Sequence, residues 1–345
     1  MIKIATGFGS GAGWKEAVSW VLEAEQLGVD SVWTAEAWGF DAISPLAYLA
    51  GKTRRVKLGT SIMQAGTRTP AAVAMTALTM QSLSEGRFIL GLGNSGPQVI
   101  EGWHGIRFDR PLQRLREIVE IVRMACSGER VIYNGKVYQL PLPGGEGRAL
   151  KTSAPPAHVP IYLATLGPKS LEVTGEIADG WLASSFTADN SKPLIDSIRR
   201  GAERAGRDFN AIEKHAGGVV QFGDDLDRLI APRKPGFAFE IGAMGSPEHN
   251  FYKDAYAMQG FADVVQQVQA LWLERKREEA AAMVPDELVI KANLLGTEAM
   301  VKDRIGAYRD AGITSISVSP AGETFAERVE TLGRFTQLVQ AVNAE

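Results

Sequence analysis

Short apolar runs alternate with longer amphipathic segments through the first third of the chain. Each run has four to eight residues, which is typical of a buried strand, and each longer segment has apolar residues at three- and four-residue spacing, which is typical of a helix. The predicted strands are 2–7, 30–35, 56–63 and 88–92, and the predicted helices are 14–27, 44–51, 70–84 and 112–126.

The same alternation continues to the end of the chain. Four more strands are predicted at 160–164, 180–184, 215–222 and 314–318, with helices at 168–177, 191–206, 297–311 and 324–343. Strands that alternate with helices form parallel sheets joined by crossover helices. Eight strand–helix pairs indicate an α/β fold of the TIM (β/α)8-barrel type rather than an open sheet.

Two stretches exceed this minimal pattern and are interpreted as insertions after strands four and seven. Residues 128–158 contain the hairpin sequence RVIYNGKVYQL, with Asn134-Gly135 as its predicted turn, and then a loop rich in Pro and Gly. Residues 223–296 are largely helical in pattern. Neither stretch has the composition of a flexible linker, so residues 1–345 are predicted to form a single domain.

Composition and charge exclude several classes of function. A formal net charge of −3 does not favour binding to nucleic acid or to an anionic membrane. The single Cys126 and four scattered histidines form no metal-ligand cluster, so no metal is predicted. No apolar run approaches the length of a membrane span, and the first residues lack the apolar region of a signal peptide. We therefore expect a cytoplasmic protein.

The segment Gly91-Leu-Gly93-Asn-Ser-Gly96 matches the dinucleotide pattern GxGxxG, but its surroundings do not. A dinucleotide site needs a tight turn into a helix and an acidic residue about 20 residues further on. Here Pro97 and Gly102 interrupt the start of any helix. We interpret the glycines as a backbone that approaches a ligand closely at the end of strand four.

Two further strand ends carry candidate chemistry. At Ala164-Thr165-Leu166-Gly167-Pro168 a strand runs directly into a helix, which offers either an anion site at the helix N-terminus or an ordinary turn. Glu36 follows strand two, where catalytic groups gather in barrels, although it could also be a solvated loop residue. The neighbouring Trp38 could form one wall of a ring-binding pocket or pack in the core.

Four segments together resemble the luciferase-like barrel family. They are TAEAWGFDAISPLAYLA, LGTSIMQAGTRTP, SEGRFILGLGNSGPQVIEGWHG and IYLATLGPKSLEVTGEIADGW, and the resemblance extends over essentially the whole chain. The branch it is most similar to contains oxidoreductases that use the deazaflavin F420, including methylenetetrahydromethanopterin reductases and F420-dependent glucose-6-phosphate dehydrogenases.

This resemblance implies a set of cofactor-binding residues. Ser61 and Ile62 match the family's non-proline cis peptide, which forms a bulge behind the deazaflavin ring. Asn94 and Ser95 match the strand tip that borders the cofactor. The backbone of Thr165, Leu166 and Gly167 matches the segment that contacts the phosphate-bearing tail.

Two departures from the family bear on catalysis. Ala37 stands where dehydrogenase-like members carry a histidine, and Gly96 where they carry a glutamate. Glu36, at the position of a family aspartate, is then the strongest acid/base candidate. The possible helpers are Gln98, Glu101 and His104, and the predicted substrate pocket comprises Trp38, Trp103, Phe251 and Tyr252.

The function implied by the resemblance is hydride transfer between C5 of F420 and a small organic substrate. One alternative is an FMN-dependent monooxygenase or flavin reductase on the same fold. Another is a carrier that binds a flavin or deazaflavin without catalysis. By analogy with the family, the protein is expected to form a homodimer.

Overall fold

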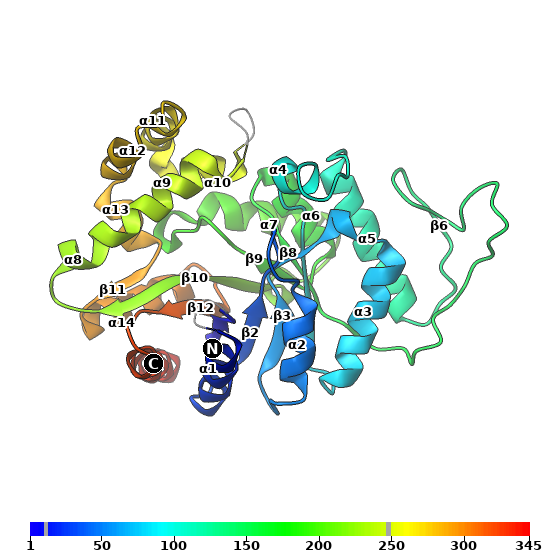
Figure 1. Ribbon diagram of the computed structural model, residues 1–345, viewed down its shortest axis with the longest axis horizontal. Coiled ribbons are helices and arrows are strands. Elements are labelled where there is room, and N and C mark those ends of the chain that lie inside the picture. The colour runs from blue at the N-terminus through cyan, green and yellow to red at the C-terminus, as the bar shows by residue number, and fades with distance from the viewer. Residues whose placement is uncertain (10–12, 246–249) are drawn as a thin grey trace. The chain divides into compact units, whose positions relative to one another are not determined.

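The computed structural model describes residues 1–9, 13–245 and 250–345 (Figure 1). Within these residues one ten-stranded sheet has the order β11-β10-β12-β1-β2-β3-β5-β8-β9, and a further pairing of β9 with β10 closes the order into a ring of eight strands. The ring comprises β1 (Lys3–Gly7), β2 (Ser31–Thr34), β3 (Lys57–Thr60), β5 (Phe88–Gly93), β8 (Ile161–Ala164), β9 (Gly180–Leu182), β10 (Glu213–Phe222) and β12 (Ser315–Pro320). This connectivity confirms the predicted (β/α)8 barrel.

Helices follow the strands as the apolar spacing predicts. They are α1 (Trp14–Gln26), α2 (Ile43–Ala50), α3 (Pro70–Leu83), α5 (Pro111–Cys126), α6 (Pro168–Ile177), α7 (Lys192–Arg204), α14 (Glu298–Asp310) and α15 (Phe325–Ala344). Thr324 begins the last helix with a reciprocal capping box to Glu327. One strand, β11 (Leu294–Gly296), lies inside the range predicted as inserted helices and pairs with β10.

The third predicted strand is interrupted. Residues 56–63 form β3 and then the two-residue β4 (Met63–Gln64), with the cis peptide bond Ser61–Ile62 between them. The Thr60 hydroxyl donates to the Gly91 carbonyl (2.7 Å) and accepts from the Gly91 N–H (2.9 Å). A side chain therefore supplies part of the pairing with β5 where β3 ends.

The hairpin after α5 is present, but its predicted turn is wrong. Tyr133 pairs with Leu140 and Asn134 with Gln139, so Asn134 is a strand residue and the turn spans residues 135–138. The buried Glu117 carboxylate accepts the backbone N–H groups of Lys136, Val137 and Tyr138 at 2.7–3.0 Å. A two-residue Asn-Gly turn could not present three successive N–H groups to one carboxylate.

The described chain divides into two compact units. Unit 1 comprises Met1–Val32, Thr165–Glu176 and Trp181–Glu345, and unit 2 comprises Trp33–Ala164 and Ile177–Gly180. In unit 2, the Trp33 ring packs against Tyr162 with 5.7 Å between ring centroids. It also lies over Gly59, where a Cβ atom would come within 2.4 Å of the ring.

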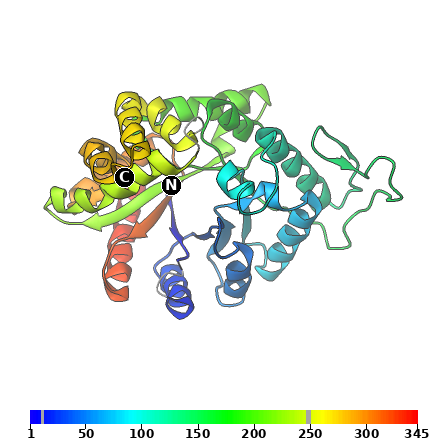
Figure 2. The same cartoon turned by 45° about the horizontal axis from the view of Figure 1, so that its top comes forward.

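The long insertion of unit 1, coloured from yellow-green to orange in Figure 2, forms a hydrophobic core from its own residues. Its helices are α8 (Leu226–Ile230), α9 (Lys234–Ala243), α10 (Phe251–Tyr256), α11 (Ala262–Leu273), α12 (Arg277–Met283) and α13 (Asp286–Lys291). Val265, Val268 and Leu288 are fully buried in this core. Among the described residues, no helix is both long and apolar enough to cross a membrane.

Candidate functional site

Glu36 stands two residues beyond β2, and its carboxylate is held by four donors. Arg68 donates from both terminal nitrogens, with Nη2 at 3.0 Å from Oε2. The backbone N–H groups of Gln64 (2.8 Å) and Ala42 (3.1 Å) complete the set. The side chain is 8% exposed, so these four donors account for the roughly four acceptor positions that a carboxylate has.

These bonds join the loop after β2 to β4. The buried Gln64 side chain also donates to the Ala37 carbonyl (3.0 Å). Arg68 was missed by the sequence analysis, because nothing in the local spacing connects it to an acid 32 residues earlier. Through these hydrogen bonds Glu36 fixes the backbone next to Ser61–Ile62.

Gly93, the last residue of β5, lies beside the bulge formed by Ser61 and Ile62. A Cβ atom on Gly93 would meet the Ile62 side chain at 2.8 Å and the Ala164 Cβ at 3.4 Å. The absence of a side chain therefore lets Ile62 lie over the end of β5. Ser61 and Ile62 remain partly exposed, so a flat ring could lie against this bulge.

Asn94 and Ser95 continue from this point and are also partly exposed. Ser95 has a φ of +58°, a left-handed conformation that is uncommon for a residue with a side chain. It is followed by the short helix α4 (Pro97–Ile100), which leaves no room for the longer helix of a dinucleotide site.

The predicted tail-binding segment lies in unit 1. Thr165 is buried, with its hydroxyl 2.7 Å from the Thr174 hydroxyl and its carbonyl accepting from Trp181 Nε1 at 3.0 Å. Leu166 and Gly167 are partly exposed and lead into α6. The first turn of a helix presents unpaired N–H groups, so a fixed segment here fits an anionic group.

The remaining predicted residues of unit 2 are exposed. Gln98 and His104 are both accessible, and Trp38 and Trp103 are 60% and 66% exposed. The Glu101 carboxylate accepts the Phe108 N–H (2.9 Å), which stabilises the turn that follows α4. None of these side chains is held in a defined acid/base arrangement within the unit.

The insertion supplies a carboxyl group that sequence analysis missed. Glu240 on α9 accepts hydrogen bonds from the Ser185 and Tyr256 hydroxyls. Burial raises the pKa of Glu240, and these two hydrogen bonds only partly oppose that shift. The predicted pocket residue Tyr252 is close enough that burial and then the Glu240 charge raise its pKa. Phe251, its neighbour, is 42% exposed.

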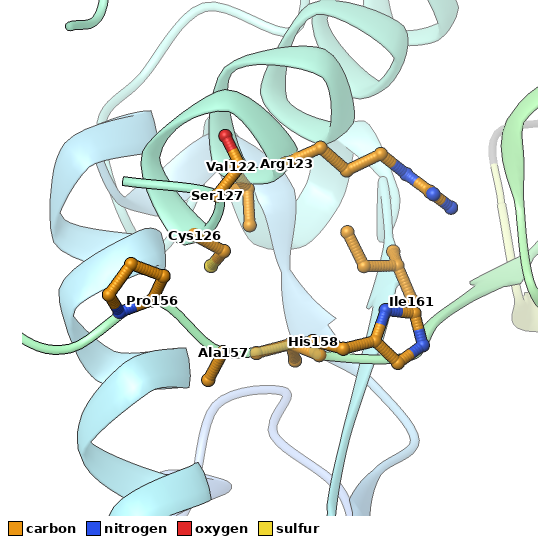
Figure 3. A pocket seen from close by; sticks show the side chains of 9 residues that line it. Val122, Arg123, Cys126, Ser127, Pro156, Ala157, His158 and Ile161 are labelled. Atoms are coloured by element: carbon orange, nitrogen blue, oxygen red, sulfur yellow. The ribbon is translucent and has the colours of Figure 1, made fainter. Parts of the chain in front are cut away.

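Unit 2 also contains a cavity of about 430 Å³ (Figure 3). It is lined by the end of α5 and by residues 156–161, which lead into β8. Cys126 faces it, and burial raises the pKa of that thiol to about 11, so the thiol is unreactive at neutral pH. Because barrel enzymes place their chemistry at the carboxyl ends of the strands, this cavity is not the predicted site.

Comparison with known proteins identifies the family. The sequence profile of the luciferase-like monooxygenase family matches residues 1–315, and the chain belongs to that family. A Mycobacterium tuberculosis protein named as a coenzyme F420-dependent oxidoreductase is 43% identical over 324 residues, covering 90% of this chain and 92% of that protein.

Two further proteins are similar over almost the whole chain. The 5,10-methylenetetrahydromethanopterin reductase of Methanolobus tindarius is 30% identical over 318 residues, covering 90% of this chain and 92% of its own. The solved structure of the coenzyme F420-dependent tetrahydromethanopterin reductase from Methanopyrus kandleri has a TM-score of 0.78 at 22% identity, covering 96% and 97% of the two chains. The last comparison supports the barrel fold.

Proposed function

We propose that the protein is an F420-dependent oxidoreductase that transfers a hydride between deazaflavin C5 and a small organic substrate. The observation that carries the proposal is the 43% identity to an F420-dependent oxidoreductase over 92% of that protein. The residues present fit the cofactor, because a partly exposed apolar bulge and a fixed helix N-terminus suit a flat ring and an anionic tail.

Each part of the chain has a defined task in this proposal. Bound deazaflavin would supply the hydride chemistry, and the protein would supply position and protons. The Ser61–Ile62 bulge supports the ring, Asn94 and Ser95 border it, and the backbone of residues 165–167 holds the tail. Trp38, Trp103, Phe251 and Tyr252 are proposed to contact the substrate.

Glu36 was predicted to transfer the proton, and its environment supports a different task. Four donors already occupy its carboxylate, and one of them is the Arg68 guanidinium. We propose that Glu36 acts as a positioning residue for the bulge and for the loop after β2. The helper roles of Gln98 and His104 stay predictions: the exposed His104 ring could transfer a proton, and the exposed Gln98 amide could donate a hydrogen bond.

The test is binding of F420 and of FMN to the purified protein, measured by fluorescence quenching and calorimetry. Tight F420 binding with FMN at least about 100-fold weaker supports the proposal, which corresponds to about 2.7 kcal/mol of discrimination. The reverse preference would assign the protein to the FMN-dependent monooxygenases and flavin reductases. Binding of neither would refute the proposal.

Catalysis is tested separately by oxidation of reduced F420 with a panel of carbonyl, imine and activated alkene acceptors. Turnover of any acceptor distinguishes an oxidoreductase from a carrier that binds the cofactor without catalysis. We also propose a homodimer, by analogy with the family. Light scattering of the purified protein tests this, and a monomer across the working concentration range would exclude it.

A further inference from the structure

Glu240 is hydrogen-bonded to the loop that follows the carboxyl end of β9. The last residue of β9 is Leu182, and Ser185, three residues further on, donates its hydroxyl to Glu240 Oε1. In (β/α)8 enzymes the loops at the carboxyl ends of the strands carry the catalytic groups. Glu240 reaches this strand end from α9, a helix of the insertion (Figure 1).

The strand end is close in unit 1 to the segment proposed to hold the cofactor tail. Trp181, within β9, donates its ring N–H to the Thr165 carbonyl at 3.0 Å. Its ring also packs edge-on against Phe186, with centroids 5.9 Å apart. Trp181 therefore contacts both Thr165 and Phe186, the residue that follows Ser185 in the chain.

The backbone around Ser185 is held in an uncommon conformation. Ser185 has a φ of +49°, and it is 6% exposed. The buried Gln259 amide fixes it, donating to the Ser185 carbonyl (2.6 Å) and to the Ala255 carbonyl (2.9 Å) while accepting from the Thr187 N–H (2.7 Å). Conformations of this kind persist where surrounding contacts determine them, and they cluster at functional sites.

Gln259 itself lies in a kink between α10 and α11, where Gln259 and Gly260 have non-helical backbone angles. The kink brings the Gln259 amide to the Ser185 carbonyl, and Tyr256, at the end of α10, donates its hydroxyl to Glu240.

The surroundings favour the protonated form of Glu240. Burial raises its pKa, and the groups that face it are the hydroxyls of Ser185, Tyr252 and Tyr256. The cation on α10, Lys253, is directed instead to Gln269 (2.9 Å) and to Asp254 (3.8 Å). Among the described residues no lysine or arginine forms an ion pair with Glu240, so only the two hydroxyl hydrogen bonds oppose the effect of burial on its pKa.

We propose that Glu240 is the general acid of the reaction and donates its proton to the substrate atom that becomes basic as the hydride arrives. This inference rests on the proposed function. The hydride forms a new C–H bond with both of its electrons, the π bond of a C=O, C=N or activated C=C group breaks, and the heteroatom or remote carbon takes the Glu240 proton. Solvent then reprotonates the carboxylate. Glu240 is partly exposed, and its Ser185 partner follows a strand end of the kind where barrel enzymes bind their substrates.

The first test measures the protonation state directly in the F420-loaded protein. Infrared difference spectra between neutral and alkaline pH should contain the C=O band of a protonated carboxyl. Glu240→Gln should remove this band, whereas Glu279→Gln, which changes an exposed acid of the same insertion, should retain it. A wild-type spectrum without a band that depends on Glu240 overturns the proposal.

The second test uses the acceptor identified by the reduced-F420 panel. Glu240→Gln should lower kcat roughly 100-fold, the usual contribution of a general acid, and should remove the decline of kcat at alkaline pH. The Kd for F420 and the thermal midpoint should change little, because glutamine can still accept from Ser185 and Tyr256. A kcat within threefold of the wild type overturns the proposal. A panel without turnover refutes the proposed function instead, while the infrared test still decides the state of Glu240.

Discussion

Individual side chains in this protein act through partners far away in the sequence. Glu36 was expected to be a free acid beside the ring, yet it is joined to Arg68 and to the backbone of β4. Glu240 lies on a helix of the insertion that the sequence did not single out, yet burial raises the pKa of its carboxyl. The chemistry of a carboxyl group is therefore set by its donors and its exposure, neither of which local spacing reveals.

Replacement of Glu36 tests its positioning role. Glu36→Gln should cost about 1–3 kcal/mol of stability, because it turns an amide towards Arg68 and leaves the guanidinium without a carboxylate. F420 affinity should fall by at least about tenfold, since the bulge loses its anchor. Arg68→Lys should lower affinity in the same direction by a smaller factor.

Calorimetric titration of both variants checks this prediction. If Glu36→Gln binds F420 like the wild type but loses turnover, then Glu36 acts on the substrate and the positioning role is wrong. Glu85→Gln is a suitable control, since Glu85 is an exposed acid in the turn after α3.

At the scale of elements, the end of one strand and the conformation of one hairpin turn each depend on a single residue. The hydrophobic spacing of the sequence does not single out either residue. Gly93 ends β5 without a side chain because Ile62 occupies the space beside it. Glu117 is buried on α5 and organises the hairpin turn from within. Burial tends to raise the pKa of this carboxyl, but hydrogen bonds from Gln113 and the turn outweigh that effect and lower it.

Gly93→Ala tests the role of the strand end in cofactor binding. The added Cβ would lie 2.8 Å from the tip of the Ile62 side chain, which can shift. Stability should therefore fall by only about 1 kcal/mol, while F420 affinity should fall about tenfold as the bulge surface is displaced. F420 affinity is measured by fluorescence quenching. An affinity equal to that of the wild type would show that Ile62 does not contact the ring.

Glu117→Ala tests the turn. Three backbone N–H groups would lose their acceptor, at a total cost of about 2 kcal/mol, since water can partly replace it at the rim of the hairpin. Limited proteolysis should then cleave within residues 128–158 faster than in the wild type. Glu146→Gln, in the exposed loop of the same insertion, should be cleaved at the wild-type rate.

The whole molecule should be sensitive to acid through a histidine in β10. His215 is 5% exposed, and burial lowers its pKa from 6.5 to about 4. Between these values the unfolded chain binds a proton that the folded chain does not. Stability contributed by neutral His215 is therefore complete above pH 6.5 and is lost as the pH falls toward 4.

This contribution should amount to about 2 kcal/mol between pH 7 and pH 5. His215→Gln should show a smaller loss of unfolding free energy over that interval, measured by urea denaturation. His104→Gln changes an exposed residue, so this variant should lose as much unfolding free energy over that interval as the wild type does. In wild-type protein, the His215 ring proton signals should not titrate above pH 5.

The sequence predicts the barrel well because each buried parallel strand is a short apolar run and each helix has its own apolar spacing. The eight predicted strands all correspond to strands of the ring. The break between Thr60 and Met63 lies inside one continuous run, so only the family resemblance indicated the cis peptide at Ser61–Ile62. Arg68 and Ser185 could not be predicted as partners of Glu36 and Glu240, because those contacts form only after the chain folds.

The inserted helices have a consequence for how new specificities arise. Residues 226–291 form a continuous stretch with its own buried core, whereas each compact unit is assembled from separate stretches of chain. A continuous, self-packed cassette can be exchanged between relatives by a single recombination event. Grafting a different helical insertion between β10 and β11 would replace Glu240, Phe251 and Tyr252, the residues proposed to act on the substrate. It would leave untouched residues 61–62 and 165–167, which are proposed to hold the cofactor.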